Sequence, residues 1–482
     1  MLFNSFEFLV FLPIVFLLYW FVFKGRQAQN VFIVVASYVF YGWWAYRFLV
    51  LIFITTLLSY LSGILIERYR DKAKWICGTN IAINIGIFCY YKYVNFFADN
   101  LETLINQFGY QLDWVTLDVI LPIGISFYTF QALSYTIDVY RRDTNATKDF
   151  IAFTSFISFF PQLVAGPIER STNLLPQFLK PRIFDYTNAV IGMRQILWGF
   201  FKKLIIADNC AQLANSIFDN YQDCNASLLL LGALFFTFQI YGDFSGYSDI
   251  AIGTARLFGV NLMKNFNLPY FSRDIAEFWR RWHISLNKWF IDYVYIPLGG
   301  SRGTKAMVIR NILIVFFLSG LWHGANWTYV VFGLYHGLLI AMLVILNLNK
   351  KSELIIAPNN FIPNIKEIVQ IFFTFNLLVI GLIIFRANDI THAIEYFSGI
   401  IDMSIFDKPN IHSLGLSFNK VIYTLIFIAI LQITDWLQRK REFGLEISNI
   451  KYRPVRWGIY ISILMLFTVF AGVQQEFIYF QF

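Results

Sequence analysis

Charged residues are scarce in this sequence. Asp, Glu, Lys and Arg make up 14% of its 482 residues, whereas hydrophobic residues make up 57%. Soluble domains carry about 25% charged residues, so the composition excludes an ordinary soluble protein and predicts an integral membrane protein. The formal charge of +8 comes from basic residues that fall in short loops, which indicates membrane topology rather than nucleic-acid binding.

Cysteine is also rare, and the signature motifs of several enzyme classes are missing. The four cysteines form no C-x-x-C pair and have no metal-ligand spacing, so we predict neither a disulfide framework nor a bound metal. The sequence contains no H-E-x-x-H and no G-x-S-x-G motif, and residues 299–305 have the wrong glycine and lysine spacing for a P-loop. The sequence therefore offers none of these catalytic motifs.

What the sequence has instead is a series of apolar segments. Shorter or Gly/Pro-interrupted segments can enter and leave a membrane on one side. We predict an all-α integral membrane protein with about eleven to thirteen transmembrane or re-entrant helices, folded as a single polytopic membrane domain over residues 1–482. The candidate segments are 8–23, 31–43, 48–66, 75–97, 115–137, 151–166, 187–206, 227–241, 244–260, 307–321, 326–346, 366–385, 418–437 and 456–474.

The charge of the loops predicts their orientation. Loops 24–30 and 67–74 are basic, whereas residues 98–114 carry three acidic side chains and no Lys or Arg. Because Lys and Arg favour cytoplasmic loops, we expect the N-terminus outside the cytoplasm. The basic run 439–441 is expected inside it.

Only five histidines occur. His323 lies in an apolar stretch, where an ionisable side chain is costly unless it is paired or used. Imidazole is suited to proton transfer near neutral pH, so His323 is a candidate catalytic residue; the alternative is a structural histidine. His336 is interpreted as a packing residue of an apolar helix, and His392 and His412 as solvated loop residues.

A second candidate, His283, lies in an aromatic and basic stretch, residues 277–293. Helical periodicity predicts one amphipathic helix at the cytoplasmic boundary, with His283 turned into the protein. A surface anchor with a structurally satisfied histidine is the competing interpretation. The helix would place His283 on the face of Trp279, Leu286 and Phe290, away from the polar stripe Arg281, Ser285, Lys288 and Asp292.

Two polar breaks interrupt the apolar segments. Residues 161–170 contain two prolines and a glycine, which predict a bent or re-entrant passage. In residues 239–249, Asp243 could pair with a buried Arg, orient a histidine or cap a helix. Asp249 is interpreted as a helix cap at a break between two segments.

Taken in order, the motifs resemble the membrane-bound O-acyltransferase (MBOAT) family, and within it the bacterial branch of the alginate O-acetyltransferase membrane subunit. The resemblance covers most of the chain and implies an MBOAT core at approximately 115–346 with a central tunnel. It rests on the segments LPIGISFYTFQ (121–131), VAGPIER (164–170), GDFSGYSDIA (242–251), FWRRWHISL (278–286), YIPLGGSR (295–302) and SGLWHGA (319–325).

The resemblance implies roles for individual residues. The family's invariant membrane histidine corresponds to His323, and its second functional histidine or asparagine corresponds to His283. His323 would act as a general base on an acceptor hydroxyl or would carry the acyl group, and both roles stay open. The residues implied to line the donor path or tunnel are Trp322, Trp282, Arg281, Lys288 and Asp243.

The resemblance also implies the reaction. A thioester, acetyl-CoA or an acyl carrier protein, is expected as the acyl donor on the cytoplasmic side, with no tightly bound cofactor. The acyl group, expected to be acetyl, would cross the bacterial inner membrane to an extracytoplasmic esterase-like acetyltransferase partner. That partner would O-acetylate an exported or cell-wall polysaccharide. The bilayer is the other expected partner, nucleic acid is not, and the polysaccharide and the oligomeric state stay open.

Two other classes of function compete with this hypothesis. A transporter or flippase of cell-envelope precursors would fit the many crossings and polar breaks, but such proteins often show internal repeats, and none is visible here. A non-catalytic scaffold would leave both histidines structural. Histidine variants of a scaffold would then keep their function whenever they keep their fold.

Overall fold

The structure, a computed structural model, describes residues 1–109, 119–348, 355–358 and 360–480. Every regular element in these ranges is a helix, which confirms the predicted all-α class. The helices group into two compact units, one of residues 1–189 with 254–263 and one of residues 190–253 with 264–482. Two of the three boundaries fall inside helices, α9 (Tyr186–Phe200) and α11 (Ala226–Leu257), and the third falls in the non-helical segment at 263/264.

The first unit contains most of the N-terminal helices. In it α5 packs against α3 and α4, and α6 packs against α2. These helices are α1 (Phe6–Leu17), α2 (Arg26–Ala45), α3 (Leu49–Arg68), α4 (Ala73–Gln107), α5 (Ile125–Arg141), α6 (Phe150–Ser158), α7 (Phe160–Leu163) and α8 (Ser171–Phe178). Helix α4 extends well past the predicted end of its apolar segment, and the start of predicted segment 115–137 lies outside the described residues.

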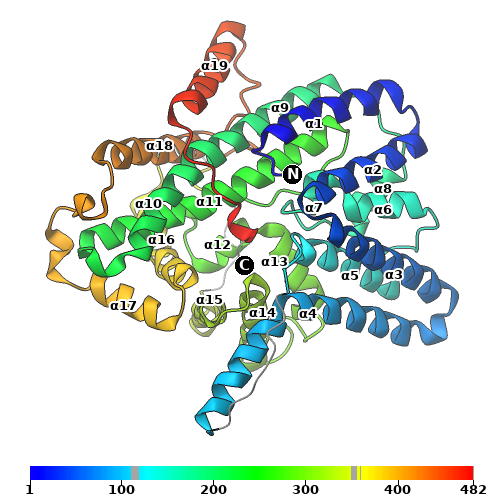
Figure 1. Cartoon of the computed structure of the whole chain (residues 1–482), viewed down its shortest axis with the longest axis horizontal. Helices are drawn as coiled ribbons and strands as arrows, with labels where there is room; N and C mark the ends of the chain where they lie inside the picture. Colours follow the sequence, from blue (N-terminus) through cyan, green and yellow to red (C-terminus); the bar gives the residue numbers. More distant parts are fainter. Residues whose placement is uncertain (110–118, 349–354, 359, 481–482) are drawn as a thin grey trace. The chain divides into compact units, whose positions relative to one another are not determined.

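The second unit contains both candidate histidines. Its helices α14 and α15 lie side by side (Figure 1) and make the most extensive helix pair of the unit. Besides parts of α9 and α11, this unit holds α10 (Asp208–Asp219), α12 (Ile275–Arg281), α13 (Ile284–Phe290), α14 (Lys305–His323), α15 (Trp327–Ile345), α16 (Ile365–Arg386), α17 (Ile390–Ile400), α18 (Phe418–Leu437) and α19 (Arg453–Phe470). A π-helical turn, η4 (Phe201–Ala207), joins α9 to α10.

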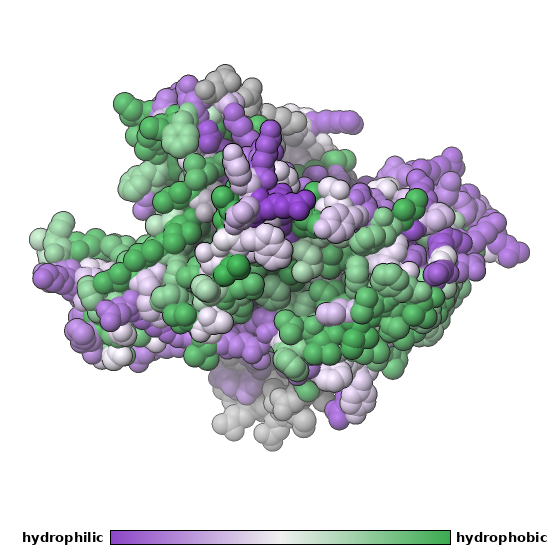
Figure 2. Space-filling model, turned by 90° about the horizontal axis from the view of Figure 1, so that it is seen from above, coloured by the Kyte–Doolittle hydropathy of each residue, from purple (hydrophilic) through white to green (hydrophobic). Residues whose placement is uncertain are grey.

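Seven of the described helices are long and apolar enough to cross a membrane. In six of them less than half of the apolar window is buried, down to 6% for α19, whereas 72% of the window of α11 is buried. Figure 2 shows apolar residues spread over large areas of the face in view, as expected for helices that contact lipid. The seven are α3 with the short turn before it (Tyr46–Arg68), α11, α14, α15, α16, α18 and α19.

The predicted break between segments 227–241 and 244–260 is wrong, because α11 runs through both as one helix. Its glycines allow another backbone to come close: a Cβ on Gly246 would collide with the carbonyl oxygen of Gly199 on α9. The glycines of this polar stretch therefore serve helix packing. The bend predicted at 161–170 is present, since α6 and α7 are separated at Phe159 and an irregular buried segment follows.

Close packing of α14 on α15 fixes the position of His323 at the end of α14. A Cβ on Gly333 of α15 would collide with the carbonyl oxygen of Phe316 and with the backbone of Gly320, both on α14. Gly324 ends α14 in extended conformation, and the Asn326 side chain accepts a hydrogen bond from the Thr328 amide to start α15. The two helices are thus joined by a short, tightly held turn.

We expect the substitution Gly333→Ala to destabilise the protein. The added methyl must push the two helices apart, and overpacking of this kind costs about 1–3 kcal/mol. Thermal unfolding in detergent, followed by tryptophan fluorescence, should show a lower Tm. Gly458→Ala on α19 is the matched control, because a Cβ there meets open space. Equal unfolding temperatures for the two variants would contradict this packing.

Candidate functional site

The two histidines singled out by the sequence come together around two aromatic rings. His323 and His283 are both buried, at 4% and 1% exposure. The ring of Trp322 lies 5.6 Å from that of His283 and 5.2 Å from that of His323. The ring of Tyr479 lies 6.2 Å and 5.8 Å from the same two imidazoles. His283 and His323 are therefore parts of one site.

The amphipathic helix predicted over 277–293 is instead two short helices, α12 and α13, broken at His283. His283 has a φ of +44°, in the left-handed region that non-glycine residues seldom adopt. The Asn287 side chain donates to the carbonyls of Trp279 and Trp282 beside the break. The prediction of one helix was wrong because these contacts, invisible to periodicity, satisfy the backbone where the helix is interrupted.

A hydrogen bond holds the ring of His283 in place. Its Nδ1 lies 3.1 Å from Oδ1 of Asn265, whereas its Nε2 has no hydrogen-bond partner among the described residues. Burial, with a smaller contribution from His323, holds the pKa of His283 well below its ordinary value. His283 is therefore neutral near pH 7.

A small apolar cavity lies beside His323, and we call it the histidine cavity. Aromatic rings supply most of its wall, so it offers few polar groups apart from imidazoles and hydroxyls. His336, interpreted from the sequence as a packing residue only, also contributes to this wall. The lining consists of Ile240, Tyr270, Phe278, Trp279, Trp282, His323, Phe332, His336, Leu378, Leu382, Phe385 and Tyr479.

The two basic residues implied to lie on the donor path have different surroundings. Arg281 is 2% exposed and forms an ion pair with Glu277 at 2.5 Å. It also donates to the carbonyl of Asn267, so its charge is already compensated. Lys288 is exposed on α13. The structure thus places Arg281 in the core of the unit and Lys288 at its surface.

Asp243 anchors the C-terminal segment of the chain. Its carboxylate pairs with Lys203 at 2.8 Å and accepts a hydrogen bond from the amide of Ile478. Lys203 also pairs with Asp208 at 2.8 Å and donates to the carbonyl of Gln475. The sequence predicted a buried Arg as one possible partner, whereas the buried partner in the structure is a lysine, Lys203.

The C-terminal segment brings a residue into the site that sequence reasoning missed. After α19, residues 471–480 run back into the second unit and end close to α12 (Figure 1). Tyr479 packs against Phe244 at 4.3 Å and lines the histidine cavity. Nothing in the sequence around Tyr479 distinguishes it from the many other aromatic residues, because its position depends on contacts with helices over 200 residues away.

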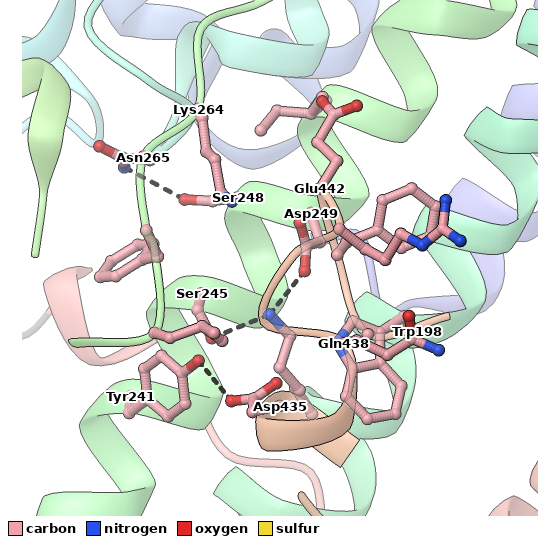
Figure 3. A pocket seen from close by; sticks show the side chains of 17 residues that line it. Trp198, Tyr241, Ser245, Ser248, Asp249, Lys264, Asn265, Asp435, Gln438 and Glu442 are labelled. Atoms are coloured by element: carbon pink, nitrogen blue, oxygen red, sulfur yellow. Dashed lines mark hydrogen bonds and ion pairs between the residues drawn. The ribbon is translucent and has the colours of Figure 1, made fainter. Parts of the chain in front are cut away.

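A small polar pocket lies on the other side of Asn265. Inside it Lys202 pairs with Asp249 at 2.6 Å, and Tyr241 donates to Asp435 (Figure 3). Asn265 belongs to the wall of this pocket and donates to Ser248 at 3.2 Å. Through Asn265 the pocket is linked directly to His283.

The position of Asp249 corrects its interpretation as a helix cap. Asp249 lies within α11, where it pairs with Lys202 and accepts from Gln195. Lys264 lies in the same pocket wall, and burial lowers its pKa. The pocket thus combines cations and carboxylates rather than a single charge. Further polar residues in the pocket lining are Gln438, Arg441 and Glu442, which follow α18.

The prediction of a solvated His392 was wrong, whereas His412 is exposed as predicted. His392 lies on α17 with its ring stacked on Tyr221 at 4.4 Å. Its Nδ1 accepts from the amide of Asn388. The surrounding polar sequence suggested a loop, but the helix turns this residue inward.

Comparison with known proteins identifies the family of this chain. The chain is 40% identical over 422 residues to a Pseudomonas aeruginosa protein named probable alginate O-acetylase AlgI, covering 86% of this chain and 78% of that protein. It is 36% identical over 504 residues to the protein of the same name from Pseudomonas putida, covering both chains completely. The model of the MBOAT, membrane-bound O-acyltransferase family, matches residues 144–380. The chain belongs to the membrane-bound O-acyltransferase family.

A more distant relative shares the full length. The peptidoglycan O-acetyltransferase of Helicobacter pylori is 30% identical over 529 residues, covering 100% of this chain and 98% of that protein. The chain is thus a multi-pass membrane acyltransferase. The part of this MBOAT protein matched by the family model contains both His283 and His323, whereas Tyr479 and the pocket residues after α18 lie beyond it.

We expect Asp243→Asn to loosen the C-terminal segment of this acyltransferase. The weaker contact with the Ile478 amide and with Lys203 should raise hydrogen–deuterium exchange in the peptide covering residues 473–480 several-fold. Asp249→Asn is the matched control, because Asp249 is on the same helix and pairs with a different lysine. If both variants exchange alike in this peptide, Asp243 does not anchor the segment.

Proposed function

We propose that this enzyme takes an acyl group, specifically acetyl, from a cytoplasmic thioester donor and passes it across the bacterial inner membrane for O-acetylation of an exported or cell-wall polysaccharide. An extracytoplasmic acetyltransferase partner completes the transfer. The observation that carries the proposal is the joint placement of His283 and His323 around Trp322 and Tyr479, beside an apolar cavity. The names of the relatives support acetyl transfer to a polysaccharide.

His323 is the proposed catalytic base. As the acceptor oxygen forms its bond to the acyl carbon, the imidazole takes the hydroxyl proton, the C–S bond breaks, and the thiolate leaves and receives that proton. Alternatively, a nitrogen of His323 attacks the acyl carbon first, the C–S bond breaks, and the thiolate leaves with the imidazole proton. The acceptor hydroxyl then takes the acyl group from the imidazole and returns a proton to it. In both cases the apolar wall of the histidine cavity keeps water from the thioester and so suppresses hydrolysis.

The polar pocket is the proposed entrance for the donor. It adjoins Asn265 and hence His283, and one of its residues after α18, Arg441, belongs to the basic run 439–441 that is expected in the cytoplasm. Amide and phosphate groups of a pantetheine thioester match a lining of Lys264, Gln438 and Arg441. Arg281 is less suited to this task, because Glu277 already compensates its charge.

We expect loss of polysaccharide O-acetylation in cells carrying His323→Ala and a strong reduction with His283→Ala. The test measures the O-acetyl content of exported glycans, with immunoblots of membranes confirming normal protein levels. His412→Ala, which alters an exposed histidine, is the control and should behave as the wild type. Normal acetylation in the His323→Ala strain at normal abundance would reject the proposed function.

Arg441→Ala should raise the KM for the donor a few-fold and leave kcat nearly unchanged. The Arg441 side chain is 42% exposed at the pocket rim, so it contributes attraction in the ground state and at encounter rather than in the chemical step. The effect should shrink at high salt because the attraction is screened. Arg453→Ala, an exposed residue at the start of α19, is the control. An unchanged KM would place the entrance elsewhere.

A further inference from the structure

Asn265 is fixed relative to His283 by both its main chain and its side chain. The carbonyl of Asn265 accepts a hydrogen bond from the amide of Ile284 at 2.9 Å. Its side-chain oxygen Oδ1 accepts from the amide and the hydroxyl of Ser285, at 3.3 Å and 2.9 Å, and lies 3.1 Å from Nδ1 of His283. Both residues adjoining the break after His283 are therefore tied to Asn265.

These contacts determine which atom of the Asn265 amide faces the histidine. A backbone amide such as that of Ser285 can only donate, so the atom facing it must be the oxygen. The amide nitrogen then points the other way, where it donates to the hydroxyl of Ser248. Reversing the amide would set two N–H donors against each other in a buried place, which is costly.

The orientation of the Asn265 amide in turn determines which ring nitrogen of His283 carries the proton. Because Oδ1 can only accept, Nδ1 of His283 must carry the proton. In the neutral ring the other nitrogen, Nε2, then keeps its lone pair. This atom is buried and lacks a hydrogen-bond partner among the described residues, although buried polar atoms nearly always have one. Nε2 can therefore accept a hydrogen bond from an N–H or O–H group of a ligand.

We propose that Asn265 is a positioning residue that holds His283 with its proton on Nδ1, so that Nε2 accepts a hydrogen bond from an N–H or O–H group of the bound substrate. Toward the substrate, His283 thus acts as a hydrogen-bond acceptor through Nε2, while its N–H group at Nδ1 is directed at Asn265. This assignment rests on the proposed function, because it gives a task within acyl transfer to His283. The strained backbone at His283 is held by the same contacts.

The position of His283 between the polar pocket and the histidine cavity agrees with this task. Asn265 is part of the pocket wall, whereas Tyr479 lines the cavity and Trp322 contacts both histidines. His283 is thus in contact with a residue of the pocket wall on one side and with Trp322, which also contacts His323, on the other. The amide groups of a pantetheine arm provide N–H donors for Nε2, and an acceptor hydroxyl provides an O–H donor.

The test combines spectroscopy with kinetics on the full-length protein in detergent. Nitrogen-15 shifts of histidine side chains distinguish the two neutral tautomers, and the His283 signals are identified by their absence in His283→Ala. The wild type and Ser248→Ala should show the proton on Nδ1. Ser248→Ala is the matched control, because it removes the partner of the amide nitrogen and leaves Oδ1 in place. Asn265→Ala should show a mixture of tautomers or the Nε2–H form.

The kinetic part uses acetyl-CoA as the probe donor. Asn265→Ala should lower kcat/KM by about tenfold or more, in the range seen when the partner that orients a histidine is lost. Asn265→Asp keeps the acceptor oxygen and should recover most of the activity and the Nδ1–H signal. This rescue separates the tautomer role from simple packing, because the two variants differ in their hydrogen-bonding capacity at this position.

Each outcome bears on the proposal by itself. A wild-type protein that transfers acetyl but carries the His283 proton on Nε2 overturns the role of Asn265 and leaves the proposed function standing. Full activity of Asn265→Ala also overturns the role of Asn265. If Asn265→Ala fails to fold, the tautomer of His283 in the wild type and the activity of Asn265→Asp still test the role of Asn265. A fully active His323→Ala protein would instead reject the proposed function.

Discussion

The second unit depends on the pairing of charged groups that its apolar surroundings would otherwise exclude. Lys203 lies in the π-helical turn after α9 and is bound by Asp208 and Asp243. A single unpaired charge at such a place would be strongly destabilising. The remaining hydrogen-bonding capacity of this cluster goes to the C-terminal segment, through the backbone of Gln475 and Ile478. One ion cluster therefore connects α9, α10 and α11 to the last residues of the chain.

Near the site, charged side chains that form ion pairs can be distinguished from the imidazole of His283. Lys202 with Asp249 and Arg281 with Glu277 satisfy each other, so their charges mainly support the fold. His283 differs, because one of its ring nitrogens is bound by Asn265 and the other has no partner among the residues that the structure describes. Hydrogen-bonding capacity is thus left at the imidazole of His283, whereas the charges of these two ion pairs are compensated.

The surroundings of the two histidines suit a reaction that must avoid water. Trp279, Trp282 and Phe332 form much of the wall around His323, and close helix packing through Gly320 and Gly333 holds this wall together. Acyl transfer in an apolar cavity gains from the exclusion of water, because hydrolysis of the acyl group is then suppressed. The polar pocket beyond Asn265 has the opposite character, and His283 lies where the two environments meet.

Local sequence patterns explain which predictions were confirmed. Long apolar segments such as 48–66, 307–321 and 366–385 became helices α3, α14 and α16, because hydrophobicity over a helix length is a local property. His283 and His323 were recognised because their surroundings in the sequence are unusual. The break at His283 was missed because it depends on hydrogen bonds from the Asn287 side chain. The continuity of α11 was missed because its glycines act through packing against α9. His392 was misjudged for the same reason.

The sequence by itself determined the membrane class, the helical architecture, the family and the two histidines at the centre of the site. Only the tertiary structure brought Tyr479, His336 and Asn265 to those histidines. It also assigned Arg281 and Asp243 to ion pairs within the fold. The physical reason is that composition and periodicity act over one helix, whereas the partners of a buried polar group are chosen across the whole folded chain.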